Sequence, residues 1–305
     1  MNAVEILELR KEFGSRRGKT TAVDSLSFDI PQGQCVAFIG PNGAGKSTTI
    51  KMLTGVMRPT SGKISILGLD PRKDRKKLAR QMSVLFGHCS KLWFHLPVVE
   101  SFDLLAAIYD LDWKNYLKRR DHLVELFRVG HLIAKPVRQL SLGERMRCEL
   151  LASFLHEPKM VFLDEPTIGL DITAKALIRD LLRTMCKELG CTLLLTSHDT
   201  DDVERLCDRV ILINKGKCVV DDSVQCMKEN YLRKRILTAV LDEKEGMIEA
   251  PGVTILESGS HRLKFEINLD ETGINEVVNL LMQRYSLRDL TIEGPSLESV
   301  IEGFY

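Results

Sequence analysis

The sequence predicts an α/β fold with a parallel sheet, because short apolar runs alternate with helical patterns along the chain. Residues 35–39, 160–163 and 192–195 form nearly continuous apolar runs, which are typical of strands buried on both faces. From Asp171 to Gly190, apolar residues recur on one helical face between two capping residue types. Strands and helices that alternate indicate a parallel sheet, whose ligands bind beyond the carboxyl ends of its strands. The residues directly after the three runs are therefore the first candidates for a functional site.

Length and composition limit the class of protein. A chain of 305 residues is long enough for one large domain or two. Lys and Arg total 43 and Asp and Glu total 42, and this balance argues against nucleic-acid binding through a global positive field. The sequence shows neither a membrane-spanning apolar stretch nor the features of a secretory signal. The eight cysteines have no C-x-x-C spacing, which predicts reduced thiols in a cytosolic protein and leaves a metal or redox centre as the alternative.

Two further regions accompany the predicted sheet. Apolar stripes between about residues 97 and 156 predict helices, so we expect a helical subdomain at about 93–157. After residue 231 the pattern changes to three strand-like runs, an amphipathic helix, a fourth strand and a short helix, at 235–241, 253–257, 263–269, 274–282, 290–292 and 297–304. This part has roughly 70 residues, which is within the range of a small domain. We therefore expect two domains, residues 1–228 and 229–305.

A glycine-rich segment follows the first apolar run and fits the pattern G-x-x-x-x-G-K-[ST]. It consists of Gly40, Pro41, Asn42, Gly43, Ala44, Gly45, Lys46 and Ser47. A helical pattern from Thr48 to Met57 follows, which is the context that this phosphate-binding motif requires. Glycines let consecutive N–H groups face phosphate oxygens, and the helix N-terminus adds its positive end. We expect Lys46 to reach the β- and γ-phosphates of ATP and Ser47 to bind Mg²⁺, whereas the alternative is a glycine turn with a chance Gly-Lys-Ser.

Polar side chains also follow the other two apolar runs. Asp164 and Glu165 come directly after 160–163, and two adjacent carboxylates repel each other unless a cation or proton lies between them. We expect Asp164 to hold Mg²⁺ and Glu165 to face the water that attacks the γ-phosphate. His198 follows 192–195 and is expected to contact the γ-phosphate and to orient Glu165 or the water. The alternatives are a solvated acid pair and a structural histidine.

Five motifs occur along the chain in the order GPNGAGKST (40–48), LSLGE (140–144), VFLDEP (161–166), IGLD (168–171) and TSHD (196–199). In the second motif, Ser141 and Glu144 fit an S-x-x-E capping box, which explains them structurally without any function. Taken together, the five motifs resemble those of the ATP-binding subunit of an ABC transporter, over roughly residues 3–225. The resemblance implies a P-loop NTPase (RecA-like) core with a helical subdomain, to which the small C-terminal α/β domain is appended.

The resemblance also implies a dimer and assigns further residues. In this family two such chains form a head-to-tail dimer, here a homodimer or a heterodimer with a similar ATPase. Ser141 and Gly143 would then contact the γ-phosphate bound by the partner, and Asp171 would lie at the dimer contact. Phe13 stands where the family places an aromatic that stacks on adenine, and its alternative is a core or edge aromatic.

The C-terminal segment 289–298 resembles the tail of drug-resistance (daunorubicin-type) exporter ATPases. This branch implies a separately encoded transmembrane permease, a peripheral location on the cytoplasmic face of the membrane, and export of a drug, lipid or other small amphiphile. Segment 91–97 has aromatics that either dock onto such a partner or pack within the helical subdomain. A non-transport ATPase and a degenerate regulatory ATPase remain the alternatives, and nucleic acid is not an expected partner.

Two positions depart from the family pattern. Leu142 and Glu144 replace a glycine and a glutamine of the usual LSGGQ signature, and His88 stands where the family has a Gln that senses Mg²⁺ and water. Because a protonated imidazole opposes Mg²⁺, we expect reduced or more pH-sensitive hydrolysis. His88→Gln is therefore expected to change the rate or the pH profile of ATP hydrolysis, and an unchanged rate and profile would contradict this role of His88.

Overall fold

The computed structural model describes residues 1–15, 18–87, 89–230, 234–242, 250–259, 261–293 and 301. The chain forms two compact units, Met1–Asp222 and Ser223–Tyr305, which are described separately below. Within the described ranges, no helix is both long and apolar enough to cross a membrane.

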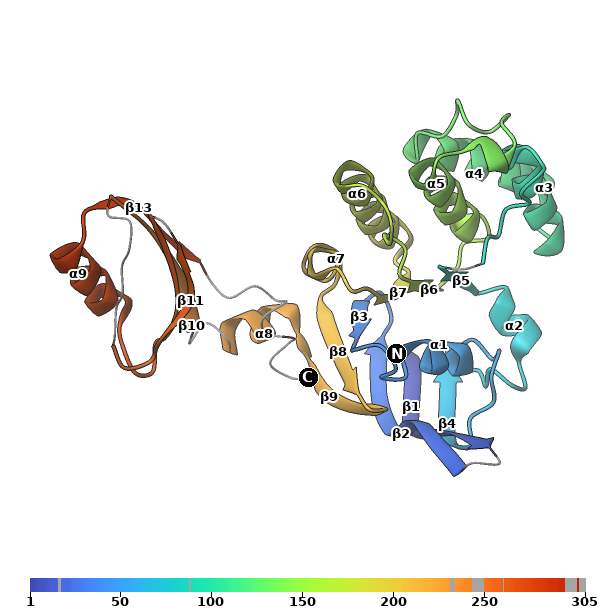
Figure 1. Ribbon diagram of the computed structural model, residues 1–305. Helices are drawn as coiled ribbons and strands as arrows, with labels where there is room; N and C mark the ends of the chain where they lie inside the picture. The colour runs from blue at the N-terminus through green and yellow to red at the C-terminus, as the bar shows by residue number, and fades with distance from the viewer. Residues whose placement is uncertain are drawn as a thin grey trace. The chain divides into compact units, whose positions relative to one another are not determined.

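The centre of the first unit is a six-stranded sheet (Figure 1). Its strands lie in the order β5 (Met82–Phe86), β6 (Met160–Asp164), β7 (Thr192–Thr196), β3 (Cys35–Ile39), β8 (Arg209–Asn214) and β9 (Lys217–Ser223). All neighbouring pairs from β5 to β8 are parallel. The three predicted strands are confirmed as β3, β6 and β7, which are buried neighbours. Their carboxyl ends therefore meet at one edge of the sheet.

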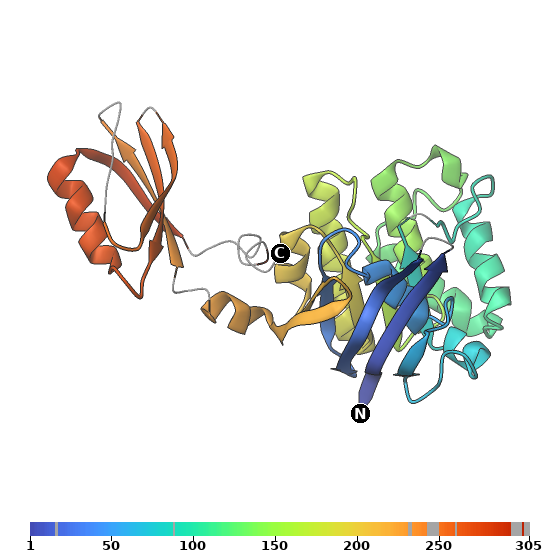
Figure 2. The same cartoon turned by 60° about the horizontal axis from the view of Figure 1, so that its bottom comes forward.

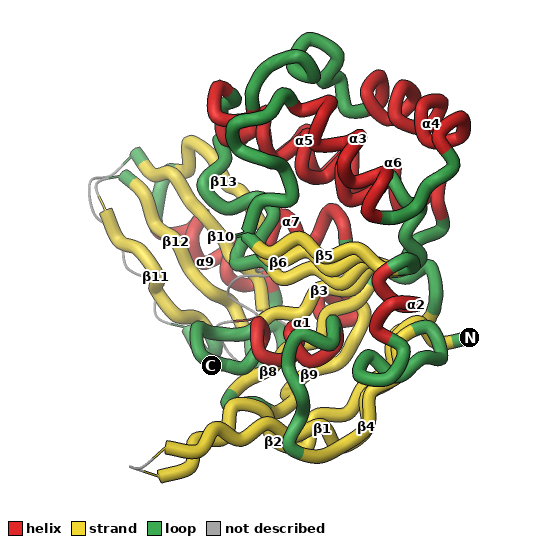
Figure 3. The backbone as a smooth tube through the Cα atoms, turned by 90° about the vertical axis from the view of Figure 1, so that its right-hand side faces the viewer, coloured by secondary structure: helices red, strands yellow, loops and turns green. Residues whose placement is uncertain are grey.

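A second sheet, which the sequence analysis did not predict, is antiparallel and has the order β2 (Gly18–Pro31), β1 (Asn2–Ser15) and β4 (Ser61–Ile66). Helix α1 (Lys46–Leu53) lies between the two sheets (Figure 3). The packing explains this position, because Phe28 of β2, Ile50 of α1 and Phe38 of β3 belong to one buried apolar cluster. The two sheets thus hold α1, and with it the loop that precedes it, from both sides.

Helices α3 (Val98–Ile108), α4 (Trp113–Leu126) and α5 (Leu142–Phe154) stand together and confirm the predicted helical region (Figures 1 and 3). Helix α6 (Ile172–Leu189) begins after the N-cap Asp171 and ends at Gly190 in a left-handed conformation, as predicted. The shorter helices are α2 (Arg75–Ala79), the 3₁₀ turn Val137–Gln139, α7 (Thr200–Leu206) and, in the second unit, α8 (Val224–Asn230).

The second unit contains a four-stranded antiparallel sheet with helix α9 (Ile274–Arg284) against one face (Figure 2). Its strand order is β11 (Val253–Gly259), β12 (Arg262–Asn268), β10 (Lys234–Leu241) and β13 (Leu287–Glu293). Leu237, Phe265 and Leu281 form its buried core. These elements confirm the predicted small α/β unit, whereas the short helix predicted at 297–304 lies outside the described residues apart from Ile301.

A buried carboxylate joins α5 to the segment after β5. Glu149 is 3% exposed, and its Oε2 accepts a hydrogen bond from the backbone N–H of Lys91 at 2.8 Å, while its Oε1 accepts one from the Ser90 hydroxyl. The Lys91 ammonium donates to the Ser83 hydroxyl at 2.5 Å. Burial lowers the pKa of Lys91 to about 8, and the charge of Glu149 opposes this shift. The helix that begins at the LSLGE motif is thereby tied to the sheet.

Glu149→Ala is expected to lower the free energy of unfolding by about 3 kcal/mol, because it leaves a buried cation without its counter-charge. Glu149→Gln removes the same charge but keeps one oxygen acceptor where Ser90 and Lys91 donate, so we expect a smaller loss. Urea unfolding curves of the full chain measure both values. Equal losses in the two variants would contradict the role of Glu149 as the acceptor of these hydrogen bonds.

The depressed pKa of Lys91 also predicts how stability changes with pH. Between about pH 8 and 10.5, the folded chain binds less proton at Lys91 than the unfolded chain, so the stability contribution of this residue rises with pH across that window. Comparison with Lys91→Met isolates this contribution. As the pH rises from 8, the unfolding free energy of wild type is expected to increase relative to that of the variant. A constant difference would show that the Lys91 ammonium is not buried.

Candidate functional site

The glycine-rich segment forms a tight loop between β3 and α1. Gly40, Gly43 and Gly45 have φ angles of +158°, +81° and +107°, which other residues rarely adopt. A Cβ atom on Gly40 would lie 2.2 Å from the carbonyl oxygen of Ile213, and one on Gly45 would lie 2.5 Å from that of Ala22. Glycine is therefore required at both positions by backbone on two sides of the loop.

The remaining residues of the loop differ in exposure. Asn42, Gly43 and Ser47 are exposed, Pro41 and Thr48 are half-buried, and Ala44, Gly45 and Lys46 are buried. The Lys46 ammonium donates hydrogen bonds to the carbonyl oxygens of Gly40 at 2.5 Å and Pro41 at 3.2 Å. It is thus folded back over the loop at the N-terminus of α1, where an anion would be bound.

Electrostatics link Lys46 to the acid pair at the end of β6. Burial lowers the pKa of Lys46, while the charges of Glu165 and Asp164 raise it. The structure therefore brings the loop and the acid pair, which are more than a hundred residues apart in the sequence, into one site.

Thr196 holds the acid pair in place from the neighbouring strand β7. Its hydroxyl donates to Asp164 Oδ1 at 2.6 Å, and its carbonyl accepts the Glu165 N–H at 3.0 Å. Glu165 has a φ of +52°, a left-handed conformation that costs a residue other than glycine about 1–3 kcal/mol. The bonds from Thr196 help to stabilise it. The sequence analysis quoted Thr196 within a motif but assigned it no role, because its partners lie on another strand.

His198 lies beside Glu165, as the meeting of strand ends predicts. The distance from His198 Nε2 to Glu165 Oε1 is 3.0 Å, and the imidazole is 47% exposed. A half-exposed imidazole at this distance can orient the carboxylate and still face a ligand in solvent. The structural-histidine alternative is less consistent with a ring that is 47% exposed and therefore not packed in the core.

The LSLGE segment forms the predicted capping box at the start of α5. The Ser141 hydroxyl accepts the Glu144 N–H at 3.3 Å, and Glu144 Oε2 accepts the Ser141 N–H at 2.8 Å. These hydrogen bonds lower the pKa of Glu144. Ser141 and Gly143 line a shallow pocket of about 380 Å³ together with Asp171, whose side chain caps α6 by accepting the Ala174 N–H at 2.8 Å. In the described ranges, no hydrogen bond or ion pair joins Ser141 or Gly143 to the 40–48 loop.

The other predicted site residues lie elsewhere. Phe13 is near the end of β1, is 41% exposed, and has the Lys11 ammonium 5.2 Å from its ring centroid. His88 lies outside the described residues, so its role stays a prediction. In segment 91–97, Trp93 and Phe94 are 38% and 53% exposed, so these two aromatics are partly free of the helical packing.

The residues present fit ATP with Mg²⁺. Backbone N–H groups of the loop, the Lys46 ammonium and the N-terminus of α1 suit a polyphosphate. The exposed Ser47 hydroxyl and the Asp164 carboxylate are oxygen ligands of the kind that Mg²⁺ prefers. Among the described residues, no group of three or more His, Cys, Asp or Glu side chains forms a separate protein-only metal site.

Comparison with known proteins gives a consistent result. The family model described as "ABC transporter" matches residues 23–168. The bacitracin transport ATP-binding protein BcrA of Bacillus licheniformis is 30% identical over 95% of this chain and 90% of its own length. The daunorubicin/doxorubicin resistance ATP-binding protein DrrA of Streptomyces peucetius is 30% identical over 92% and 87%. Among solved structures, cbiO1 of Clostridium perfringens, part of the ABC transporter complex cbiONQ, superimposes with a TM-score of 0.66 at 29% identity, covering 76% of this chain and 95% of its own.

Proposed function

Since this chain belongs to the ABC transporter family as an ATP-binding subunit with ATPase activity, we propose that it powers an exporter of drugs, lipids or other small amphiphiles. The observation that carries the catalytic part is the 3.0 Å contact of Glu165 with His198 beside the glycine loop and Lys46. The exporter part is supported by the likeness to two transport and resistance subunits over most of both chains.

In the proposed mechanism, Lys46 and the loop N–H groups bind the β- and γ-phosphates. Ser47 and Asp164 would hold Mg²⁺, which would supply positive charge to neutralise the charge that develops on the phosphate oxygens. Glu165 accepts a proton from the attacking water, and the His198 imidazole orients the Glu165 carboxylate through Oε1. Phe13 stacks on adenine with its exposed face. The chemistry is mainly positioning and electrostatic stabilisation.

We also propose that two chains close head to tail around ATP. The pocket lined by Ser141, Gly143 and Asp171 is supplied by different elements from the loop and the acid pair. Ser141 caps the N-terminus of α5. The positive end of this helix favours an anion, here the γ-phosphate of the ATP bound by the partner chain. Each chain thus carries one half-site at the phosphate loop and one at the Ser141 pocket, and each half-site is completed only in a dimer.

The transport partner is proposed to be a separately encoded permease, with this chain on the cytoplasmic face of the membrane. The exposed Trp93 and Phe94 support docking of a partner at segment 91–97. The C-terminal unit, residues 229–305 in the sequence-based division, is proposed as an accessory domain.

The test is co-expression of the full chain with a candidate permease, chosen from the genes that neighbour its own. Proteoliposomes that contain both are expected to move an amphiphilic dye only when Mg²⁺ and ATP are supplied on the side of this chain. The matched control is the same vesicle with the permease alone. Co-purification with ribosomes or DNA, and dye movement that does not depend on this chain, would contradict the transporter function.

A further inference from the structure

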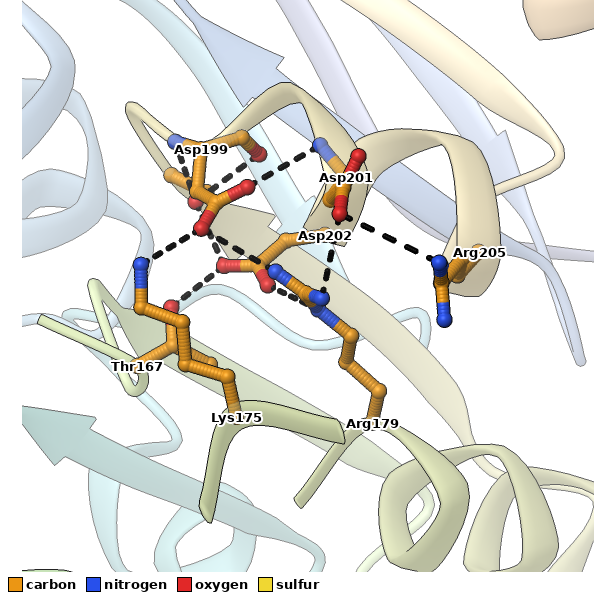
Figure 4. Close-up of polar contacts among 8 residues, drawn as sticks. Thr167, Lys175, Arg179, Asp199, Asp201, Asp202 and Arg205 are labelled. Carbon is orange, nitrogen blue, oxygen red and sulfur yellow. Dashed lines mark hydrogen bonds and ion pairs between the residues drawn. The ribbon is translucent and has the colours of Figure 1, made fainter. Parts of the chain in front are cut away.

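A buried ionic cluster joins helix α6 to the segment that carries His198 (Figure 4). Asp202 is fully buried, and its Oδ1 pairs with Arg179 Nε at 2.5 Å. Its Oδ2 accepts hydrogen bonds from the Ser197 hydroxyl at 2.7 Å and from the Thr167 hydroxyl. Arg179 is itself only 5% exposed. One carboxylate therefore contacts the loop after β6, helix α6 and the segment after β7.

The same arginine also reaches the residue directly after His198. Asp199 Oδ2 lies 3.0 Å from the Arg179 guanidinium and 2.6 Å from Lys175 Nζ. Burial raises the pKa of Asp199, but the Lys175 hydrogen bond and the Arg179 charge outweigh it, so the pKa is lowered. Asp201 lies at the exposed rim, 3.5 Å from Arg179 and 4.0 Å from Arg205.

The cluster fixes the residues directly before and after His198 in the sequence. Ser197 is fixed by Asp202, and Asp199 is fixed by Lys175 and Arg179 of α6. The contact with Thr167 extends the cluster to the loop between Glu165 and Asp171. A buried ion pair adds little stability compared with a well-packed apolar pair, so stability alone does not explain this one.

We propose that Arg179 and Asp202 are positioning residues for hydrolysis, which keep His198 on Glu165 Oε1 and couple its position to Asp171 at the start of α6. This inference rests on the proposed function of Glu165 and His198. A shift of Asp171 carries α6 with it, and the Arg179 contacts pass the movement to Ser197 and Asp199. His198 then follows because both of its neighbours are bound.

The test uses the purified full chain with ATP and Mg²⁺. Asp202→Asn is expected to lower kcat about ten- to hundredfold, because a displacement of about 1 Å at a catalytic group has this effect, while KM for ATP changes less than about twofold. The matched control is Asp221→Asn, which breaks the ion pair of Arg209 and Asp221 in β8 and β9 and is expected to leave kcat unchanged. The crystal structure of Asp202→Asn supplies a second readout, in which His198 Nε2 is expected to leave hydrogen-bonding distance of Glu165.

The double variant Arg179→Met, Asp202→Asn separates positioning from stability. It removes both buried charges, so we expect Tm to recover most of what Arg179→Met alone loses, while kcat stays low. Recovery of kcat together with Tm would overturn the proposal, as would a folded Asp202→Asn variant with normal kcat and an unmoved His198. If the wild-type chain did not hydrolyse ATP, the proposed function would fail instead, and the His198–Glu165 distance in the variant crystal would still decide the positioning role.

Discussion

Glu165→Gln is expected to reduce kcat for ATP hydrolysis by about 10²–10⁴-fold, the usual contribution of a positioned general base. The amide has the shape of the carboxylate, but it cannot accept the proton of the attacking water. The left-handed backbone and its bonds to Thr196 are independent of the side-chain charge, so the variant is expected to fold. ATP affinity should be retained or increased, because one negative charge near the phosphates is removed.

Steady-state hydrolysis and equilibrium ATP binding by the full chain check this prediction. Glu188→Gln is a suitable control, since Glu188 also lies near a histidine, 3.8 Å from His122, but belongs to none of the five motifs. Its kcat is expected to match wild type. Normal turnover of Glu165→Gln would mean that another group takes the proton, and the catalytic role proposed for Glu165 would be wrong.

Lys46→Met is expected to weaken ATP binding by about ten- to hundredfold. The ammonium makes charge-assisted hydrogen bonds to phosphate oxygens, and bonds of this kind contribute about 1.5–3 kcal/mol each. In the free chain the same ammonium lies across the loop on the Gly40 and Pro41 carbonyls, so it is already in place for the phosphates. Methionine keeps the apolar stem and removes the charge.

Isothermal titration with ATP in the presence of Mg²⁺ measures this loss. Lys51→Met is the matched control, because Lys51 is an exposed lysine in the last turn of the same helix. Since burial lowers the pKa of Lys46, the Lys46→Met chain is expected to be as stable as wild type. Unchanged affinity in a folded Lys46→Met variant would contradict the phosphate-binding role.

The sequence predicted the parallel strands because they are buried on both faces, which makes them continuous apolar runs. It did not predict the antiparallel sheet, in which one face is solvated. The signal was nevertheless present in β2, where Leu26, Phe28 and Ile30 are buried and alternate with exposed Ser27 and Asp29. This alternation covers only five residues, but that is long enough to indicate a half-buried strand.

The contiguous motifs predicted the residues of the candidate site, but they did not predict the residues that hold them in place. Thr196 acts on Asp164 and Glu165 across a strand pair, and no local pattern connects these positions. In the same way, Asp199, Asp201 and Asp202 look like a solvated acidic helix start in the sequence. Only the packing of α6 against α7 shows that Arg179 lies among them.

The phosphate loop is in contact with the backbone of both sheets of the first unit. Gly40 lies against the carbonyl of Ile213 at the end of the parallel sheet, and Gly45 lies against that of Ala22 in the antiparallel sheet. The loop therefore takes its shape when the two sheets assemble around α1, and its conformational entropy is lost during folding, before any nucleotide arrives. A bound phosphate meets a preorganised receptor, so its binding does not include the further cost of ordering the loop.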